Sequence, residues 1–366
     1  MVFSTFCLNN YAIFPLLSSQ KMQQQKTSQN QPKTHEDLLV QEDEVRRLTR
    51  DLPKTYFSSK FKLVKYQGFW CPDVSNYLGS ILAFQRHFQA RDTDLIVASF
   101  PKTGTTWLKS LLFSVINREK YDIRTTPLLS SHPHELVYRL EVDVYGNAFD
   151  YPRPCHLNDL PSPRLLHTHL PYTSLPESIK FSGCKVLYIS RNPMDTFVSL
   201  WYFTTSAMKK IEGDDFEYVS LEEFFEDFIQ GKIVHGPFFD HVVEFWKASL
   251  ERPKNVLFLK YEDLKDGPIT ELKKLAEFVG VPFTPKEESE GVIKDIIGLC
   301  SIDSMKEMEG NKSGVFNKFY EKKSYFRKGE VGGWTQHFTP SMVQRIKAIM
   351  HEKFESIGLS FNLGEQ

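Results

Sequence analysis

The stretch DLIVASFPKTGTTWLK, residues 94–109, decides the fold of this chain. Its apolar, β-branched run from Leu95 to Phe100 predicts a buried strand that ends at Pro101. A short loop of Lys, Gly and Thr residues follows, and an apolar helical pattern begins at Trp107. The first N–H groups of a helix have no partners within it, and the helix dipole adds positive potential there. The segment therefore predicts a phosphate or sulfate site directly after the first core strand.

The residues of this loop suit an anion but not the usual nucleoside triphosphate motif. Lys102 supplies a full positive charge, and Thr103, Thr105 and Thr106 supply hydroxyl donors around Gly104. The Walker pattern GxxxxGK[ST] is absent, because the lysine here precedes the glycine. An ATP-dependent small-molecule kinase is one alternative, and it would require magnesium and a carboxylate near the loop. No Walker-type acid follows the predicted strands, so we rank the kinase alternative low.

Composition and charge limit the class of protein. The chain has 366 residues, of which 41% are apolar, and this suits one large α/β domain or two small ones. The net charge of −1 leaves no overall field that would favour nucleic acid or an acidic membrane. No apolar run is long enough to span a bilayer. Five widely spaced cysteines without a CxxC pair indicate a reducing compartment and no disulfide framework. We therefore expect a cytoplasmic protein that binds neither nucleic acid nor membrane.

The first fifty residues differ from the rest of the chain. Residues 1–19 lack the basic start and the clean apolar core of a signal peptide, and a transit peptide would contain arginine before Arg46. The Gln-, Lys- and Ser-rich stretch 20–34 is typical of a disordered extension, and residues 36–50 have the charged pattern of a peripheral helix. We therefore divide the chain into an N-terminal extension, residues 1–50, and a folded domain, residues 51–366.

Strand and helix patterns alternate along the folded domain. The predicted elements are an edge strand at 63–70, a helix at 76–88, the strand and helix of 95–117, and strands at 164–170, 185–191 and 255–261, the last two followed by helices. This alternation predicts a single α/β domain with a mostly parallel central sheet flanked by helices. Residues 118–163 show no clear period, and so long a segment is more often a substrate loop than a connector.

Four chemically useful residues follow the ends of the predicted strands. Ligands of parallel sheets bind beyond the carboxyl ends of the strands, where Lys102, His169, Arg191 and Tyr261 are expected. A neutral histidine is a natural base for a hydroxyl, although a histidine at a strand end is often only structural. Arg191 needs an anion or a carboxylate, and Asp195, four residues on, is the alternative partner. The sequence therefore predicts a cationic rim with one candidate base.

Two HxH pairs raise the question of zinc. His132 and His134 form one pair and His167 and His169 the other, and alternate strand positions place both members on one face. No third ligand is spaced regularly near either pair. We therefore predict no metal site.

A second Gly-rich basic loop lies near the C-terminus, in the run FRKGEVGGW at 326–334. Two adjacent cations, a glycine and flanking aromatic residues are typical of a loop that binds a phosphorylated nucleotide. A surface turn with ordinary cations is the alternative. Arg327, Lys328 and Gly329 are the candidate ligand residues of this loop.

Together these segments resemble the plant-type branch of the cytosolic sulfotransferase family, which transfers a sulfuryl group from PAPS (3′-phosphoadenylyl sulfate) to an acceptor hydroxyl. PKTGTTW at 101–107 is similar to the family's P-loop-like 5′-phosphosulfate loop, and THLPYTSLP at 168–176 to the segment with its catalytic histidine. RNPMDTFVSLWYF at 191–203 resembles the 3′-phosphate segment, and LKYEDLKDGP at 259–268 the segment whose tyrosine lies near the nucleotide. Residues 326–334 resemble the loop that closes over PAPS.

The resemblance implies a PAPS-dependent enzyme that acts without a metal. It makes His169 the base that removes the acceptor proton and Lys102 the group that stabilises the bridging oxygen as the bond to sulfur breaks. The residues that it assigns to PAPS binding are Lys102, Thr103, Gly104, Thr105, Thr106, Trp107, Arg191, Ser199, Tyr261, Arg327, Lys328 and Gly329. A non-catalytic PAP- or nucleotide-binding protein is the alternative from another class, and it would lack the histidine.

Two departures from the family pattern affect what the resemblance implies. Many animal members carry a lysine two residues before the catalytic histidine, where His167 stands here, so Lys102 would bear more of the leaving-group charge. The family's dimer motif KxxxTVxxxE would need lysine, valine and glutamate where Thr335, Pro340 and Gln344 stand. We therefore predict a monomer.

The acceptor pocket is expected to form from the loop 118–163 and Phe203. The aromatic residues of that loop are Tyr121, Tyr138, Tyr145, Phe149 and Tyr151. They favour a small apolar or aromatic alcohol over a sugar polymer. Plant-type relatives act on flavonols, hydroxyjasmonates, brassinosteroids and desulfoglucosinolates, and a flavonoid or similar phenol is the first acceptor that we expect.

Overall fold

The structure is a computed structural model that describes residues 42–58, 60–73, 77–146, 157–213, 219–316 and 320–364. The predictions for residues 1–41, for Cys7 and Cys155 and for the aromatic residues Phe149 and Tyr151 lie outside these ranges.

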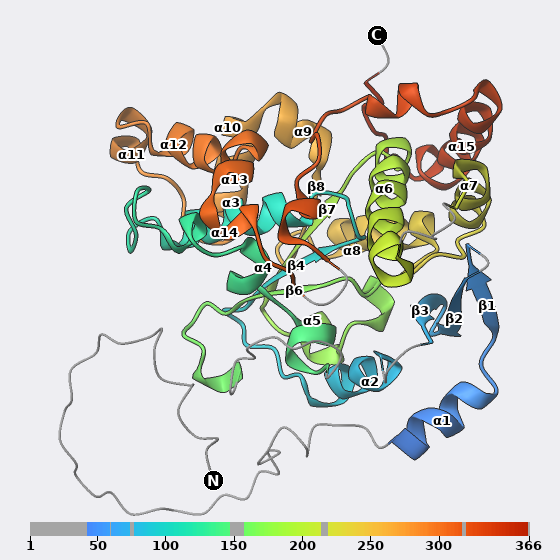
Figure 1. Cartoon of the computed structure of the whole chain (residues 1–366). Coiled ribbons are helices and arrows are strands. Elements are labelled where there is room, and N and C mark those ends of the chain that lie inside the picture. Colours follow the sequence, from blue (N-terminus) through green and yellow to red (C-terminus); the bar gives the residue numbers. More distant parts are fainter. Residues whose placement is uncertain are drawn as a thin grey trace, which may run out of the picture. The chain divides into compact units, whose positions relative to one another are not determined.

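Five parallel strands form the central sheet (Figure 1). In spatial order they are β5 (Tyr138–Arg139), β6 (Leu165–Thr168), β4 (Leu95–Ser99), β7 (Lys185–Ser190) and β8 (Val256–Lys260). The four strands predicted for this sheet are confirmed, and each is a short apolar run in the sequence. The fifth, β5, was not predicted, because two residues without an apolar run give no periodic signal; it extends the sheet by pairing with β6.

Helices of very different length connect and cover the strands. The α-helices are α1 (Glu42–Arg50), α2 (Tyr77–His87), α3 (Thr105–Asn117), α4 (Pro133–Leu136), α5 (Glu177–Phe181), α6 (Pro193–Glu212), α7 (Leu221–Ile229), α8 (Phe238–Glu251), α9 (Tyr261–Asp266), α10 (Pro268–Phe278), α11 (Pro285–Ser289), α12 (Val292–Leu299), α13 (Ile302–Glu307), α14 (Glu309–Lys312) and α15 (Pro340–Lys353). The 3₁₀ helices are η2 (Pro127–Leu129), η4 (Leu157–Asp159), η5 (Tyr172–Ser174), η6 (Lys322–Tyr325), η7 (Gly333–Gln336) and η8 (Glu355–Ile357), and η3 (Leu140–Val144) is a π-helix.

Both faces of the sheet are covered by helices, as the alternating pattern predicts. Ile96, Val186 and Tyr188 face a core that includes residues of α2, α6, α7, α8 and α15. Val97, Leu187 and Ile189, one position along, face a second core that includes residues of α3, α10, α12 and α13. Successive residues of a strand point to opposite faces, so a nearly unbroken apolar run is buried on both sides.

The stretch predicted as one edge strand, 63–70, is instead two strands of a separate sheet. Here β1 (Lys54–Phe57), β2 (Phe61–Tyr66) and β3 (Phe69–Pro72) form an antiparallel meander. The turn between β2 and β3 is Gln67-Gly68, and both residues have positive φ, 47° and 90°. A two-residue turn of this kind matches the twist of a hairpin, and its glycine was the signal that the edge-strand prediction overlooked.

Residues 94–109 form the predicted strand, loop and helix, but the helix begins earlier than predicted. Helix α3 starts at Thr105, two residues before the predicted position, and Gly104 is its N-cap with φ 116°. Lys102 also has positive φ, 71°, which is uncommon for a residue with a side chain. This backbone turns sharply at the end of β4 and presents the N-terminus of α3 to the sheet edge.

The remaining predictions for the described chain concern its helices and its cysteines. Helix α6 begins after Asn192, whose side chain accepts a hydrogen bond from the Asp195 N–H at 2.8 Å, the predicted cap. Helix α9 was not predicted. Cys71, Cys184 and Cys300 are buried free thiols. Among the described helices, none combines the length and the apolar content that crossing a bilayer requires.

Candidate active site

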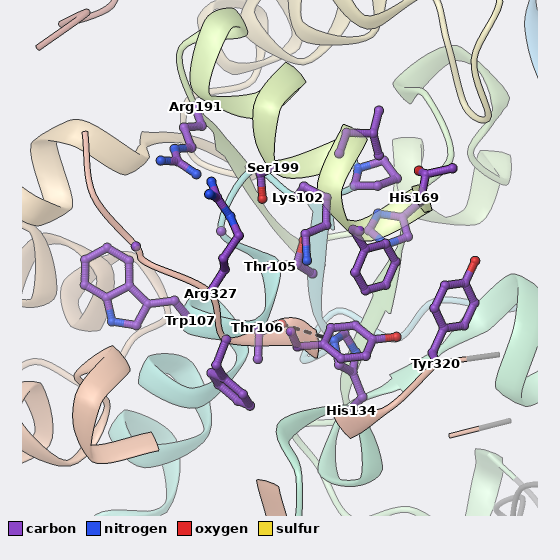
Figure 2. Close-up of a pocket in the computed structure, with 18 of the residues that line it drawn as sticks. Lys102, Thr105, Thr106, Trp107, His134, His169, Arg191, Ser199, Tyr320 and Arg327 are labelled. Atoms are coloured by element: carbon purple, nitrogen blue, oxygen red, sulfur yellow. Dashed lines mark hydrogen bonds between the residues drawn. The ribbon is translucent and has the colours of Figure 1, made fainter. Parts of the chain in front are cut away.

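A cavity of about 800 Å³ lies at the carboxyl ends of the sheet strands. Its walls come from the β4–α3 loop, from α6 and α9, from the antiparallel sheet of β1, β2 and β3, and from residues 325–329. Of the predicted site residues, those that line it are Lys102, Gly104, Thr105, Thr106, Trp107, His169, Arg191, Ser199, Tyr261, Arg327, Lys328 and Gly329. Tertiary structure therefore gathers residues from five separate sequence segments around one space (Figure 2).

The β4–α3 loop is braced from beneath by its own hydroxyl groups. Thr103 is fully buried and donates its hydroxyl to the carbonyls of Phe100, at 2.8 Å, and Ile189, at 2.9 Å. Its side chain is therefore committed to the loop and absent from the cavity wall, unlike Thr105 and Thr106. Thr105 Oγ1 lies 2.7 Å from the Ser99 hydroxyl, which ties the first turn of α3 to the end of β4.

His134 braces the same loop from its other side. Its Nε2 lies 3.2 Å from Thr106 Oγ1, as Figure 2 shows, and its Nδ1 lies 2.7 Å from the ammonium nitrogen of Lys109. Lys109 is fully buried and also donates to the Val137 carbonyl at 2.9 Å. In the sequence, the HxH spacing marks His134 only as a candidate metal ligand, because nothing local links it to a threonine on another element.

Three cationic side chains, Lys102, Arg191 and Arg327, gather above the N-terminus of α3 (Figure 2). Burial, together with the charges of Arg327 and Arg191, lowers the pKa of Lys102 to about 7. The pKa of Arg327 is also lowered, by burial and then by Arg191. The backbone N–H groups and the dipole at the start of α3 also favour negative charge, so the cluster is suited to anionic groups.

Arg191 pairs with Asp195, the alternative partner that the sequence offered, and also with a backbone carbonyl that was not predicted. Its guanidinium lies 3.5 Å from the Asp195 carboxylate and also donates to the Glu330 carbonyl. Within the described residues its buried Nε has no hydrogen-bond partner, and the Nε of Arg327 has none either. The ion pair therefore orients Arg191 without exhausting its donors.

Asp195 also holds the C-terminal loop in place. Its carboxylate accepts the backbone N–H of Gly332 at 2.9 Å and that of Trp334 at 3.0 Å. The hydroxyl of Tyr261 donates to the Gly329 carbonyl at 2.9 Å, which fixes the same loop at a second point. The sequence suggested a loop over the nucleotide, but the residues that fasten it lie far from it in the chain.

Trp107 and Tyr261 form an aromatic corner beside the cationic cluster. Their ring centroids are 5.1 Å apart at 65°. The Arg191 guanidinium lies over the Tyr261 ring at 4.6 Å from its centroid. This corner offers a flat apolar surface next to charge, which suits a nucleobase attached to phosphate.

His169 lies toward the other end of the cavity, and a hydrogen bond fixes which of its ring nitrogens carries the proton. Its Nδ1 is 2.7 Å from the Ser99 carbonyl, and a carbonyl oxygen can only accept, so Nδ1 carries the proton. The pKa of His169 lies well below its ordinary value, because burial and the neighbouring His235 and Arg139 disfavour a second proton. The ring is therefore neutral near pH 7, and its Nε2 holds a free electron pair.

Two groups that the sequence analysis missed fix the backbone of His169. The Glu141 carboxylate accepts the His169 N–H at 2.8 Å, and His241 donates from Nε2 to the His169 carbonyl, the two atoms being 3.1 Å apart. The Tyr188 hydroxyl lies 2.9 Å from His241 Nδ1 and donates to it. No sequence pattern connects these residues, since each comes from a different element.

His167 has no contact with the cavity. It is fully buried, neither ring nitrogen has a hydrogen-bond partner among the described residues, and burial and Lys109 lower its pKa well below the ordinary value. A neutral, enclosed imidazole cannot supply the charge of a lysine. Among the described residues, no group of three His, Cys, Asp or Glu side chains is arranged to hold a metal ion.

The aromatic walls near His169 differ from the predicted ones. Phe203 lines the cavity as expected, but Tyr145 packs against Phe84 in the core and Tyr121 stacks on Phe113. The described aromatic residues that line this end instead are Phe57, Phe61, Tyr77, Tyr320 and Tyr325. From the predicted substrate loop come His134, Arg139 and Asp143, which are polar. Composition alone could not show which aromatic residues face inward.

Comparison with known proteins agrees with this geometry. The family model described as "Sulfotransferase domain" matches residues 92–358. Cytosolic sulfotransferase 5 of Arabidopsis thaliana is 44% identical over 321 residues, which are 87% of this chain and 97% of that protein. A crystal structure of an Arabidopsis thaliana sulphotransferase has a TM-score of 0.67 at 36% identity, and the match covers 88% of this chain and 98% of that chain.

A mouse sulfotransferase crystallised with PAP is more distant, with a TM-score of 0.59 at 28% identity over 80% of this chain and 93% of that chain. The matched residues include the β4–α3 loop, the strand of His169, the segment of Arg191 and the loop of Arg327. The chain therefore belongs to the sulfotransferase family and is a PAPS-dependent sulfotransferase.

Proposed function

We propose that the protein transfers the sulfuryl group of PAPS to a hydroxyl of a small organic acceptor, with His169 as the base. The observation that carries the proposal is the pairing, in one cavity, of a cationic cluster at a helix N-terminus with a neutral histidine whose Nε2 is free. The cluster suits the two charged ends of the donor, and the histidine suits the acceptor proton.

The residues present fit PAPS. The N-terminus of α3, with Lys102, Thr105 and Thr106, would hold the 5′-phosphosulfate. The unpartnered Nε atoms of Arg191 and Arg327 provide buried donors for the 3′-phosphate, together with Ser199, Lys328 and Gly329. Trp107 and Tyr261 would flank the adenine. Thr103 contributes its backbone alone, because its hydroxyl is committed to the loop.

The proposed reaction is an in-line transfer. His169 Nε2 takes the proton from the acceptor hydroxyl as that oxygen bonds to sulfur. The bond from sulfur to the bridging oxygen breaks, and its electron pair remains on the 5′-phosphate of PAP. Lys102 stabilises the charge on the bridging oxygen, since His167 is neutral and enclosed. The products are a sulfate ester and PAP, and protein cations serve where kinases use magnesium.

The test is sulfate transfer from labelled PAPS, in the presence of EDTA, to representatives of four acceptor classes. These are flavonols, hydroxyjasmonates, brassinosteroids and desulfoglucosinolates, with the phenolic flavonols first. We expect labelled product from at least one class and thermal stabilisation by PAP that exceeds that by ATP. Stabilisation by PAP without transfer to any acceptor would favour a non-catalytic binding protein. Transfer only with ATP and magnesium would favour a kinase.

The proposal includes the setting of the enzyme. We propose a cytoplasmic monomer whose partner is the small acceptor, with no nucleic acid, membrane or metal, and an N-terminal extension, residues 1–50, ahead of a catalytic domain at 51–366. The names of the Arabidopsis relatives, cytosolic sulfotransferases, support the compartment. Removing residues 1–41 should leave PAP binding and turnover unchanged, and a loss of either would overturn this division of the chain.

A further inference from the structure

Arg139 is a charged residue of the cavity wall that neither the motifs nor the proposed reaction uses. It ends β5, at the edge of the sheet, where it pairs in parallel register with His167 of β6. His169 follows directly after the end of β6. Arg139 and His169 both line the cavity, and they lie close enough that, besides burial and His235, the charge of Arg139 lowers the pKa of His169.

The guanidinium of Arg139 is enclosed but not paired. Arg139 lines the cavity and is partly exposed. Within the described residues, no carboxylate lies within 4.0 Å of its guanidinium, and the guanidinium donates no hydrogen bond. The backbone N–H of Arg139, by contrast, donates to Asp143 Oδ2 at 2.6 Å. A guanidinium has five N–H donors, and enclosing it removes water that would bind them. An unpaired guanidinium in a cavity wall therefore favours the binding of an anionic ligand group.

The charged and titratable groups around Arg139 leave its charge in place. Burial opposes the charge, but Tyr77, Asp143 and Glu141 together raise the pKa of Arg139 above the ordinary value. Glu141 Oε1 is occupied by the His169 N–H, and the pKa of Glu141 is raised by burial. The histidines 134, 167, 169 and 235 are neutral, because burial lowers the pKa of each. Asp143 and Glu141 thus stabilise the charge of Arg139, and among the described residues neither forms an ion pair with its guanidinium.

We propose that Arg139 determines acceptor specificity, and that the acceptor carries a carboxylate in addition to the hydroxyl that receives the sulfuryl group. This inference rests on the proposed function and narrows its acceptor. The carboxylate pairs with Arg139 while the hydroxyl meets His169 Nε2, and the apolar body of the acceptor lies against Tyr77, Tyr320 and Tyr325. A planar guanidinium matches the two oxygens of a carboxylate, which a single ammonium cannot do.

The experiment compares hydroxy acids with their own methyl esters, which differ only in the charge. Suitable pairs are 4-hydroxycinnamic acid and a long-chain ω-hydroxy fatty acid, each with its ester, assayed with the full chain and labelled PAPS. We expect kcat/KM for the acid to exceed that for the ester in the wild-type protein. In Arg139→Gln the acid-to-ester ratio should fall by about 10- to 100-fold, the range for a hydrogen-bonded charge. Arg139→Lys should lie between the two.

A matched control and a measurement without turnover keep the result unambiguous. Arg124→Gln replaces an exposed arginine outside the cavity and should leave the ratio unchanged. Titration of the PAP-bound protein with the same pairs should give the same order of affinities, and PAP affinity itself reports whether each variant is folded. Equal transfer to acids and esters, or a ratio that Arg139→Gln does not alter, overturns this inference alone. Transfer to a flavonol but to neither member of any pair also overturns this inference alone, whereas a PAP-binding protein that transfers to none of these acceptors overturns the proposed function as well.

Discussion

At the scale of single residues, His169 and Lys102 owe their chemistry to neighbours rather than to their own side chains. The Ser99 carbonyl sets the tautomer of His169, and burial keeps its ring neutral. Burial and two arginines lower the pKa of Lys102 to about 7. These surroundings keep His169 neutral, as a general base must be, and bring the pKa of Lys102 close to neutral pH.

Replacement of the proposed base should separate catalysis from binding. In His169→Ala we expect turnover to fall by about 10²–10⁴-fold, the usual contribution of a positioned base, while PAP affinity stays at the wild-type level. Labelled-PAPS assays and calorimetry with PAP measure the two. His351→Ala, on the exposed face of α15, is the control for a histidine lost elsewhere. Sulfation above a few per cent of wild type would rule out this base.

Loss of the Lys102 charge should affect the transition state more than the bound nucleotide. In Lys102→Met we expect kcat to fall by about 10²–10³-fold, because a group that stabilises developing charge acts most strongly when the bond breaks. PAP affinity should fall by a smaller factor. Steady-state kinetics and calorimetry provide the comparison. A defect confined to affinity would mean that Lys102 only binds.

The lowered pKa of Lys102 predicts that nucleotide binding takes up a proton. In the ligand-free site the pKa is about 7, so at pH 8 most Lys102 is neutral, and at pH 6 most is charged. A bound anion favours the charged form and raises the pKa, so PAP affinity should weaken as pH rises above 7. Calorimetry in buffers of different ionisation enthalpy should detect proton uptake at pH 8 and little at pH 6. Uptake that persists in Lys102→Met would assign it to another group.

At the scale of elements, the site depends on how loops join strands to helices. Gly104 caps α3 at a φ of 116°, and a Cβ added there would lie 2.8 Å from atoms of both Ile189 and Tyr261. The fastening of the C-terminal loop by Asp195 and Tyr261 is of the same kind, since it joins the start of α6 and α9 to residues 329–334. The proposed anion site is therefore held by α6, α9 and the C-terminal loop as well as by β4 and α3.

Substitution of Gly104 should disturb stability and binding together. In Gly104→Ala we expect the free energy of unfolding to fall by about 1–3 kcal/mol, from strain in the backbone and crowding by Ile189 and Tyr261. PAP affinity should fall as well, because the first N–H groups of α3 would shift. Gly298→Ala is the control: this α12 glycine has no atom within 4 Å of an added Cβ. Urea denaturation that ranks the two variants equally would contradict the role assigned to Gly104.

At the scale of the whole molecule, the five-stranded sheet serves as a frame that brings distant segments to one edge. The two cores on its faces are built from alternate residues of the same strands, so the strand ends cannot move independently. Residues of the acceptor end come from as far apart in the chain as β1 and η6. Specificity is consequently a property of the assembled fold.

The positions of a dimer motif predict a monomer. Thr335 lies in η7 and donates its hydroxyl to the Gly332 carbonyl at 3.0 Å, and Pro340 is the first residue of α15. Neither offers the charge or the extended apolar contact that the motif would supply. Sedimentation should show one species with the mass of a single chain at micromolar concentration. A stable dimer that survives dilution would show that another surface replaces the motif.

Much of the fold follows from local patterns, and the exceptions have physical causes. The strands at 164–170, 185–191 and 255–261 were predictable because burial on both faces requires continuous apolar runs. The two-residue β5 and the turn at Gln67-Gly68 were missed, since neither changes the hydrophobic period. The place of Arg191 in the cavity wall was predictable from the end of its strand, whereas Glu141 and His241, which bind the backbone of His169, leave no trace in the sequence.

The sequence by itself determined the strand, turn and helix that carry the proposed anion site, because the lysine and the three threonines of PKTGTTW need only this local structure to come together. It also determined the family, since five motifs occur in one order. Only the tertiary structure decided the tautomer of His169, the pKa of Lys102, the enclosure of His167 and the open guanidinium of Arg139. These properties are set by desolvation and by charges that lie close in space but far apart along the chain.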